Sequence, residues 1–379
     1  MAQHFIVVGA GMIGLATALG LRQQGHRVTL LERGAAPSYT ETTELRVSAI
    51  AHHSRQLLHE LGVWSTIPPA RVGPYSAMEV WDHDSFGRVH FTAQEVNQAD
   101  LGAIVENRVI ETHLWQAAAA AGVTLFAETA VQRHAVEHDT VWVETDTTRI
   151  QGDYLIAADG VRSPLRHAEG LPLTFWDYQQ QGCVAVIQCS EPHGGCARQV
   201  FLPTGPVAWL PLADPHLVSL VWSADNEAAK QLQNATDADF IKQLQAVSDQ
   251  CLGQLQLAST RAYFPLRMQY AQRWVQQRML LIGDAAHSIH PLAGQGANLG
   301  FGDVVALLAV TESSFEHADL RAWERQRKVA ASQMIAAMEG FKRGFGSASP
   351  LLKLTRGLGL SFANGFTPIK RALIKSALG

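Results

Sequence analysis

Three glycines near the N-terminus have the spacing of a site for a phosphate-containing ligand. Gly9, Gly11 and Gly14 follow the apolar run His4–Val8, which is typical of a strand buried on both faces. A run at helical spacing comes next, and a second apolar run ends at Glu32. In such a unit the glycines let the backbone approach a pyrophosphate at the helix N-terminus, and the acid accepts from ribose hydroxyls. The pattern predicts dinucleotide binding; the alternative is a glycine-rich turn in an ordinary strand–helix–strand unit.

Two later pairs of glycine and aspartate also stand where an apolar run ends. Asp159 and Gly160 close one such run, and Gly283 and Asp284 close another. We expect both runs to be buried strands, which places both pairs in turns at a sheet edge. Taken alone, an aspartate in the position of Asp284 also fits a helix cap.

A glycine-rich loop follows the second pair, from residue 288 to residue 300, and opens a helix that the pattern predicts over 302–310. Pro291 and three glycines suit a backbone held close to a ligand, with N–H groups free at the helix start. His290 could hold or transfer a proton in such a pocket, since a histidine side chain ionises near neutral pH. Alternatively, His290 is hydrogen-bonded to the loop backbone.

Composition places the chain among folded proteins and excludes several classes. The 379 residues are 47% hydrophobic with a net charge of −4, so the chain can bury a sizeable core and lacks the basic excess of nucleic-acid-binding proteins. Four cysteines form no CxxC pair, which favours a reducing cytosol over a disulfide scaffold. His287 and His290 lie near Asp284 without an HExxH pattern or a third ligand, so we expect no metal site. The glycine-interrupted N-terminal run has no preceding cation, which favours a folded segment over a signal peptide.

Together these motifs resemble those of a known enzyme family. The three glycines with Glu32, the string 159–166 (D-G-x-x-S-x-x-R) and the string 283–287 resemble the FAD-dependent aromatic hydroxylases, the group A flavin monooxygenases. The string 287–300 is similar to the branch that hydroxylates the ring of ubiquinone precursors. The resemblance implies a monooxygenase that uses FAD, NAD(P)H as a transient electron donor and O2, through a flavin hydroperoxide, on a polyprenylated phenol. Two rivals stay open: a flavin hydroxylase of another aromatic compound, and a non-catalytic FAD-binding subunit of a biosynthetic complex.

The resemblance also assigns roles to individual positions. The implied cofactor-binding residues are Gly9, Gly11 and Gly14 for the pyrophosphate; Glu32, Arg33 and Val131 for the adenosine; Arg46, Asn107 and Arg108 near the flavin, its phosphates or its ribityl chain; Asp159 and Gly160 for FAD and the nicotinamide donor; Gly283 and Asp284 for the ribityl hydroxyls; and the amides of Gly296, Ala297 and Asn298 for the isoalloxazine carbonyl. The implied catalytic residues are His290, Pro291 and Arg46. Ala297 departs from the Leu or Val that is usual in the family.

The implied fold class is α/β: a Rossmann-like FAD-binding domain of the glutathione-reductase-like flavoprotein kind, interleaved with an antiparallel-sheet substrate domain and followed by a C-terminal helical segment. The expected boundaries are 1–75 with 100–170 and 270–340 for the FAD-binding domain, 76–99 with 171–269 for the substrate domain, and 341–379 for the helical segment. Short β-rich runs at 199–202, 207–210 and 217–222 predict an antiparallel meander in the substrate domain.

The predicted substrate region carries little positive charge. Between residues 171 and 226, Arg198 is the sole Lys or Arg, which favours an uncharged substrate over an aromatic acid held by a cationic clamp. The aromatic side chains of this region fit either a pocket for a ring and an isoprenoid tail or the core of the sheet, since large aromatics are mostly buried. These side chains are Trp176, Tyr178, Phe201, Trp209 and Trp222.

The C-terminal segment is both basic and apolar. Residues 340–379 carry seven Lys and Arg and no acid, and two helical stretches within 350–378 would each have an apolar face with a basic rim. Either these helices lie on an anionic membrane, where a polyprenylated substrate resides, or they pack on the protein or a sister subunit. We expect a cytoplasmic protein with peripheral contact at the inner membrane, acting as a homo-oligomer or within a ubiquinone-biosynthesis complex, and no nucleic-acid partner.

Overall fold

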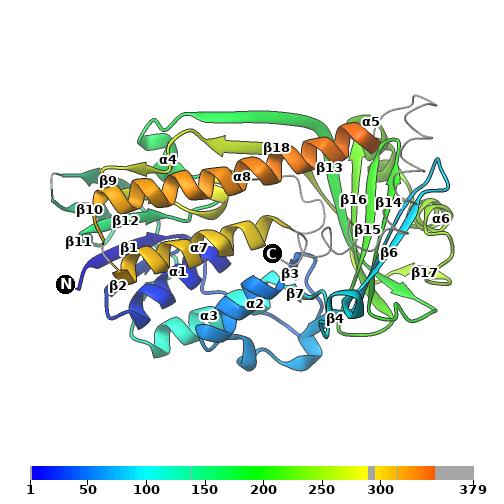
Figure 1. Ribbon diagram of the computed structural model, residues 1–379, viewed down its shortest axis with the longest axis horizontal. Coiled ribbons are helices and arrows are strands. Elements are labelled where there is room, and N and C mark those ends of the chain that lie inside the picture. The colour runs from blue at the N-terminus through cyan, green and yellow to red at the C-terminus, as the bar shows by residue number, and fades with distance from the viewer. Residues whose placement is uncertain (1, 138, 289–294, 314, 346–379) are drawn as a thin grey trace.

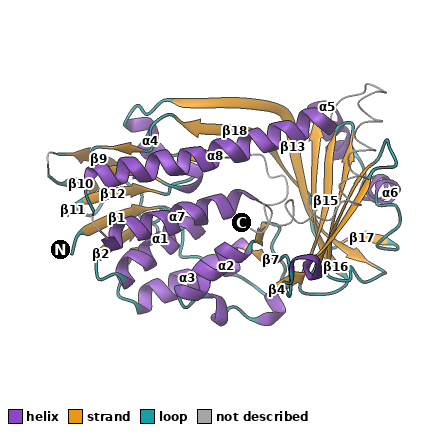
Figure 2. Ribbon diagram, in the orientation of Figure 1, coloured by secondary structure: helices purple, strands orange, loops and turns teal. Residues whose placement is uncertain are grey.

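The computed structural model describes residues 2–137, 139–288, 295–313 and 315–345. Within them, the strands form a six-stranded sheet, a nine-stranded sheet and two three-stranded sheets. Figure 1 shows the six-stranded sheet at one end of the molecule and the nine-stranded sheet at the other, and Figure 2 shows the helices that surround the first. None of the described helices has the length and apolar character needed to cross a membrane.

The six-stranded sheet is mostly parallel. It is built from β1 (His4–Val8), β2 (Arg27–Leu31), β8 (Thr124–Phe126), β12 (Tyr154–Ala157), β19 (Val275–Gln276) and β20 (Met279–Leu281), with α1 (Met12–Gln23), α3 (Asn107–Ala120) and α7 (Gln295–Ser313) beside it. The strand order is β19-β20-β12-β1-β2-β8, and every neighbouring pair is parallel except β19 with β20. Apolar β-branched runs favour strands covered on both faces, and one buried core unites these strands with the three helices.

The nine-stranded sheet is antiparallel at every pairing but one. Its strands are β5 (Ala77–Asp82), β6 (Arg88–Thr92), β13 (Leu173–Cys189), β14 (Cys196–Leu202), β15 (Gly205–Pro211), β16 (Leu217–Asp225), β17 (Leu255–Leu257), β18 (Ala262–Ala271) and β21 (His287–Ser288). The order is β21-β18-β13-β16-β15-β14-β5-β6, with β17 on β13, and β14 pairs with β5 in parallel. Two helices, α5 (Asn226–Asn234) and α6 (Asp237–Val247), cover one face through a core of their own.

A three-stranded sheet lies between the two large cores. It consists of β3 (Val47–Ile50), β7 (Gly102–Glu106) and β4 (Val72–Tyr75) in the order β3-β7-β4. Side chains alternate along these strands: Ile50 and Val105 belong to the core of the six-stranded sheet. Ala49 and Ile104 pack instead with Ala197 of the nine-stranded sheet. The face of the nine-stranded sheet that carries Ala197 is called the inner face below.

The remaining elements connect these layers. They are α2 (His52–Glu60), α4 (Pro164–Ala168), the sheet of β9 (Arg133–Val136), β10 (Val141–Glu144) and β11 (Arg149–Gly152), and the 3₁₀ turns η1 (Trp64–Thr66), η2 (Pro69–Arg71), η3 (Ala93–Val96) and η4 (Gly283–Ala285).

One long helix, α8 (His317–Phe345), reaches from one large sheet to the other (Figure 1). Near its start, Leu320 and Trp323 are buried in the core of the six-stranded sheet. Farther along, Met334 packs against Phe201 and Ile335 packs beside Leu266, both in the nine-stranded sheet. The helix therefore contacts both halves of the molecule.

The predicted fold class is confirmed, and the differences lie in the details of pairing. The helix predicted over 302–310 begins earlier, at Gln295, because the glycines of the preceding loop are part of its first turns. The predicted antiparallel meander is present as β14, β15 and β16. The parallel pairing of β14 with β5 was not predicted, because β5 comes from a distant part of the chain.

The aromatic side chains of the predicted substrate region do not share one place. Trp209 and Trp222 are buried against α5 and α6, so the sheet-core interpretation is right for them. Tyr178 and Phe201 are buried in two small clusters that α8 joins. Trp176 is 51% exposed. The predicted C-terminal helices lie outside the described residues.

Candidate functional site

Four segments that carry motif residues meet at one edge of the six-stranded sheet. β2, β1, β12 and β20 are neighbouring parallel strands, so their carboxyl ends lie side by side. Gly9 directly follows β1 and Glu32 directly follows β2. Asp159 and Gly283 each stand two residues beyond their strands, β12 and β20. This edge is where open α/β sheets bind their ligands.

Two of the three motif glycines are required by packing, and the third faces open space. A Cβ at Gly9 would lie 2.3 Å from the carbonyl oxygen of Ala158, and a Cβ at Gly14 would lie 2.0 Å from the carbonyl oxygen of Gly9. A Cβ at Gly11 would meet no atom within 4 Å. Gly11 is the N-cap of α1, and no side chain caps this helix start. Its free N–H groups and the space beside them suit a pyrophosphate.

The predicted adenosine contacts lie next to this helix start. The Glu32 carboxylate accepts from the backbone N–H of Ala10 (2.7 Å) and of Gly34 (2.8 Å). It keeps lone pairs for ribose hydroxyls and is partly exposed. Arg33 is exposed, while Val131 is partly buried against the core of the six-stranded sheet.

The predicted flavin-side cations gather near Asp284. Arg46 immediately precedes β3, and its carbonyl accepts from the backbone N–H of Asn107 (2.9 Å). Both Arg46 and Arg108 are exposed. Burial raises the pKa of Glu111, and the nearby charges of Arg108 and Arg46 oppose that shift. The Arg46 charge also acts on Asp284, so residues from three separate segments share one electrostatic neighbourhood.

The Asp284 carboxylate is crowded by protein yet open to solvent. Burial raises its pKa above the ordinary value of 3.8, and the charges of His287 and Arg46 only partly offset this rise. The residue is nevertheless exposed. A side chain that is surrounded by protein and still reaches solvent lies in a concavity, where a carboxylate can accept from the hydroxyls of a bound ribityl chain.

Asp159 presents an unused acceptor at the same edge. Its Oδ1 is buried and has no hydrogen-bond partner among the described residues, and burial raises its pKa. The neighbouring Gly160 has a φ of +83°, and a Cβ there would meet no atom within 4 Å. Arg166 fixes this turn to η4, since its guanidinium donates to the carbonyls of Val161 (2.9 Å) and Ala285 (2.8 Å).

At the start of α7, the Asn298 side chain binds neighbouring backbone, and the helix-start N–H groups face the expected cofactor. The buried Asn298 side chain accepts from the N–H of Ala51 (3.0 Å) and donates to the carbonyl of Ala49 (2.8 Å), which ties α7 to β3. The backbone N–H groups of Gly296, Ala297 and Asn298 belong to the first turn of α7, where a helix start can donate to a cofactor carbonyl. A Cβ at Gly296 would meet no atom within 4 Å.

These observations fit FAD, because free space or an available acceptor coincides with several of the expected contacts. Space is open beside Gly11, Gly160 and Gly296, and acceptors stand at Asp159 and Asp284. His290 and Pro291, the predicted catalytic pair, lie in the segment 289–294 outside the described residues. Within the described ranges, no group of three His, Cys, Asp or Glu side chains could hold a metal ion.

Sequence reasoning missed a buried carboxylate that holds the segment before Arg46. Glu106, at the end of β7, accepts from the Arg71 guanidinium (2.9 Å) and from the backbone N–H of Glu44 (2.6 Å). Its side chain is only 5% exposed. An acid that ends an apolar run, as in residues 102–106, was the available signal.

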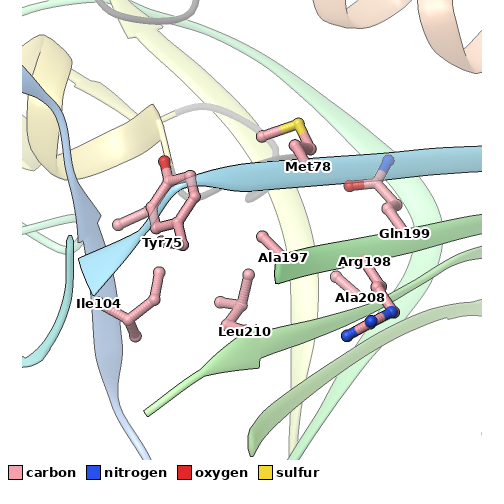
Figure 3. Close-up of a pocket in the computed structure, with 9 residues that line it drawn as sticks. Tyr75, Met78, Ile104, Ala197, Arg198, Gln199, Ala208 and Leu210 are labelled. Carbon is pink, nitrogen blue, oxygen red and sulfur yellow. The ribbon is translucent and has the colours of Figure 1, made fainter. Parts of the chain in front are cut away.

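A cavity opens between the three-stranded sheet and the inner face of the nine-stranded sheet. It is shallow and opens to solvent, with an enclosed volume of about 20 Å³, and its lining includes Tyr75, Met78, Ala208 and Leu210. Burial, followed by the charge of Asp100, raises the pKa of Tyr75 to about 12, so its hydroxyl stays protonated at neutral pH. The lining is otherwise formed mainly by small and apolar side chains (Figure 3).

Comparison with known proteins agrees with this site. Residues 3–337 match the family described as FAD binding domain. The chain is 36% identical to 3-demethoxyubiquinol 3-hydroxylase of Escherichia coli over 98% of this chain and 97% of that protein. It is 32% identical to the human ubiquinone biosynthesis monooxygenase COQ6, mitochondrial, over 98% of this chain and 92% of that protein.

Two solved structures share the fold at low identity. One is p-nitrophenol 4-monooxygenase PnpA of Pseudomonas putida, with a TM-score of 0.82 and 18% identity over 100% of this chain and 98% of that one. The other is Klebsiella pneumoniae HpxO complexed with FAD and uric acid, with a TM-score of 0.78 and 20% identity over 99% and 95%. The fold and the site define an FAD-binding oxidoreductase. The chain belongs to the family of FAD-dependent monooxygenases that includes the two ubiquinone-pathway relatives.

Because Gly14 is packed against backbone and Gly11 faces open space, replacing each with alanine gives a matched pair of variants. Gly14→Ala forces a Cβ against backbone, and overpacking of this kind costs about 1–3 kcal/mol, so the Tm of the FAD-free protein should fall by several degrees. Gly11→Ala should leave that Tm unchanged and raise the Kd for FAD, because its Cβ enters the space for the pyrophosphate. Thermal unfolding and flavin-fluorescence titration measure both; equal Tm losses in the two variants would contradict the assignment.

Asp284→Asn should weaken FAD binding while stabilising the FAD-free protein. The amide donates where the ribityl hydroxyls donate, and loss of a charged acceptor costs about 1.5–3 kcal/mol, which raises the Kd for FAD about tenfold or more. Because the folded-state pKa of Asp284 lies above its unfolded value, the charged form opposes folding at neutral pH. The Tm advantage of the variant should therefore grow as pH rises above 3.8 and vanish below it. A Tm difference that is independent of pH would refute this account.

Proposed function

We propose that the chain hydroxylates the aromatic ring of a polyprenylated phenol on the route to ubiquinone. In the balanced reaction, NAD(P)H, a proton and O2 are consumed, one oxygen atom enters the ring as a hydroxyl group and the other leaves as water. The observation that carries the proposal is the edge of the six-stranded sheet that fits FAD, and the apolar hollow on the inner face is a candidate place for an uncharged ring. The substrate class comes from the names of the two ubiquinone-pathway relatives.

The charge on the inner face supports an uncharged substrate. Arg198 borders the cavity, but its guanidinium donates to the carbonyl of His193 (2.9 Å) and lies 3.6 Å from the Glu79 carboxylate. Figure 3 shows this guanidinium and the Gln199 amide on opposite sides of β14. A soluble aromatic acid would need a cation directed into the cavity. The side chains at hand are Tyr75, Met78 and Gln199, which suit a phenol with ether or hydroxyl substituents.

The choice of family member also belongs to the proposal. The stretches 78–82, 171–178 and 214–217 are similar to bacterial 2-polyprenylphenol (2-octaprenylphenol) hydroxylase, which favours that activity among those of the branch. Identity of 36% with a relative that carries a different name leaves the ring position to experiment.

In this mechanism the protein orients and shields the reactants. Bound FAD supplies electron transfer from NAD(P)H and the activation of O2. The helix-start amides of α1 and the carboxylates of Glu32 and Asp284 hold the cofactor, and Arg46 lies beside its flavin end. The cavity walls hold the ring and exclude water. The Tyr75 hydroxyl, protonated at neutral pH, can donate to a ring oxygen. His290 is proposed to share the phenol proton and Pro291 to shape the loop near the ring.

The direct test is turnover of a short-chain prenylphenol by the FAD-loaded protein under ¹⁸O2. The product should gain one labelled oxygen, with one NAD(P)H oxidised per product, and EDTA should not change the rate. Ala208→Phe places a ring in the hollow and should lower kcat/KM about tenfold or more, because loss of about 1.4 kcal/mol of substrate binding corresponds to a tenfold change. Its FAD content should stay at the wild-type level, and Ala318→Phe, at an exposed position of α8, should behave as wild type.

Three results would overturn the proposal. They are turnover of soluble aromatic acids only, no NAD(P)H oxidation with any aromatic compound, and loss of activity in EDTA that zinc or iron restores. If none of these results is found, mass spectrometry of the quinone intermediates that accumulate in a deletion strain identifies the ring position.

We further propose that the basic C-terminal segment brings the enzyme to the membrane that holds its substrate. This proposal rests on sequence, since residues 346–379 lie outside the described residues. Each cation near an anionic surface contributes about 1 kcal/mol, and salt screens that attraction. Peripheral attachment at the inner membrane would give a cytoplasmic enzyme access to a lipid. A homo-oligomer or a biosynthetic complex would be the other route to such a substrate.

Liposome flotation tests the membrane proposal. Wild type should float with anionic vesicles at low salt and less at high salt. Lys370→Glu with Arg371→Glu should abolish flotation. The matched control is Lys230→Glu with Lys242→Glu, which reverses two exposed cations on α5 and α6 and should float as wild type does. Equal flotation by both double variants, or none by wild type, would show that the segment has another role.

A further inference from the structure

A buried carboxylate in the middle of α7 has no part in the site described so far. Asp303 is fully buried, and it interrupts an apolar helix. Its Oδ2 lies 2.6 Å from His287 Nε2 and accepts from the backbone N–H of Gly283 (3.2 Å). Its Oδ1 accepts from Arg327 Nε of α8 (2.7 Å). One carboxylate therefore joins α7 to two other segments, residues 283–287 and α8.

The Arg327 guanidinium completes the connection between α7 and α8. Besides Asp303, it donates to the carbonyl of Leu299 in the first turns of α7 (3.0 Å). A Cβ at Gly302 would lie 2.8 Å from this guanidinium, so the glycine leaves room for the arginine. The Trp323 indole N–H donates to the backbone carbonyl of Asp303 (3.2 Å).

The charges in this cluster compensate one another. Burial alone raises the pKa of Asp303, but the charges and hydrogen bonds of His287 and Arg327 outweigh burial, so the pKa lies below its ordinary value. A buried ion pair is often no more stabilising than an apolar contact of the same volume. Apolar contacts could thus attach α8 to α7 without the ion pair between Asp303 and Arg327. Stability alone therefore does not explain why Asp303 also contacts Gly283 and His287.

The explanation is the position of the segments that Asp303 joins. Gly283 immediately precedes Asp284, whose carboxylate faces the concavity at the cofactor edge. Asn298 lies five residues before Asp303 on α7, and its backbone N–H is expected at the flavin end of the same site. The Asp303 carboxylate thus holds the segment of Asp284 at a fixed distance from the start of α7. The Asp284 carboxylate is expected to contact the ribityl chain, and the Asn298 N–H is expected to contact the flavin.

We propose that Asp303, held by Arg327, is a positioning residue for bound FAD. It fixes the segment Gly283–His287 against α7, so that the Asp284 carboxylate and the first N–H groups of α7 meet the cofactor together. FAD contacts neither Asp303 nor Arg327 in this arrangement. The inference concerns cofactor binding and does not depend on which aromatic ring is hydroxylated.

The test compares two changes in the cluster with a matched change outside it. Arg327→Lys keeps the charge, and hence the fold, but loses the Nε contact to Asp303 and the contact to Leu299. Asp303→Asn with Arg327→Gln removes both charges together, so that neither is left uncompensated in the core. The control is Glu324→Gln, also on α8 and 2% exposed, whose carboxylate contacts Trp274, Arg321 and Lys328.

Three quantities are measured for each variant: the Tm of the FAD-free protein, the Kd for FAD by fluorescence quenching, and the absorption maximum and midpoint potential of the bound flavin. The double variant should raise the Kd about 10- to 100-fold, as expected for the loss of charged hydrogen bonds. It should also shift the flavin spectrum and potential. Arg327→Lys should shift the same quantities in the same direction by a smaller amount. Glu324→Gln should leave Kd, spectrum and potential at wild-type values even if its Tm falls.

A merely structural role would lower the Tm and leave the flavin unaffected. The proposal is overturned if both cluster variants bind FAD within twofold of wild type with an unchanged spectrum and potential. It is also overturned if Glu324→Gln changes these quantities as much as the cluster variants do. If the double variant fails to fold, Arg327→Lys alone decides between the two outcomes.

Discussion

Parallel pairing between β1 and β12 determines where each residue at the cofactor edge can lie. Val8 is opposite Ala157 in the register, so both strands end at the same level and their following turns come into contact. The Cβ that Gly9 lacks would overlap the carbonyl oxygen of Ala158, which makes the glycine a consequence of this register. A slip of one residue would turn each side chain of a strand to the opposite face. The free space at Gly11 and the acceptor at Asp159 depend on the same pairing.

The three-stranded sheet links the position of the six-stranded sheet to that of the nine-stranded sheet. Because alternate side chains of β3 and β7 belong to different cores, a displacement of either core would move the other. Arg46 stands at the start of β3, and the cavity is bounded by Ala49 on the same strand. Arg46, which is expected near the flavin, and one wall of the hollow are thus carried by β3 and the residue before it. A ring held in that cavity has a defined position relative to the flavin end of the site.

The cofactor edge could be predicted from sequence because its signals are local. Each motif is a strand end followed by glycine or an acid, and the chemistry of a pyrophosphate or a ribose restricts which residues can serve. The nine-stranded sheet could not be predicted in full, because the parallel pairing of β5 with β14 depends on contacts between distant residues. The bulge in β13 between Asp177 and Gln180 has no glycine to signal it. Asp303 was visible as an acid within an apolar stretch, but its partners on two other segments were not.

The order in which strands pair has a consequence for how the chain is made. β1 pairs with β12, β12 pairs with β20, and β5 pairs with β14, and each pair joins distant parts of the chain. Neither large sheet can therefore be completed during synthesis of the first half of the polypeptide. Long-range parallel pairing is slow to form and leaves apolar strand edges unprotected meanwhile. A growing chain of this design exposes β1, α1 and β2 as an aggregation-prone fragment until residues near 281 have left the ribosome. A cut between residues 157 and 279 would likewise separate β12 from β20, so neither fragment would contain the complete six-stranded sheet.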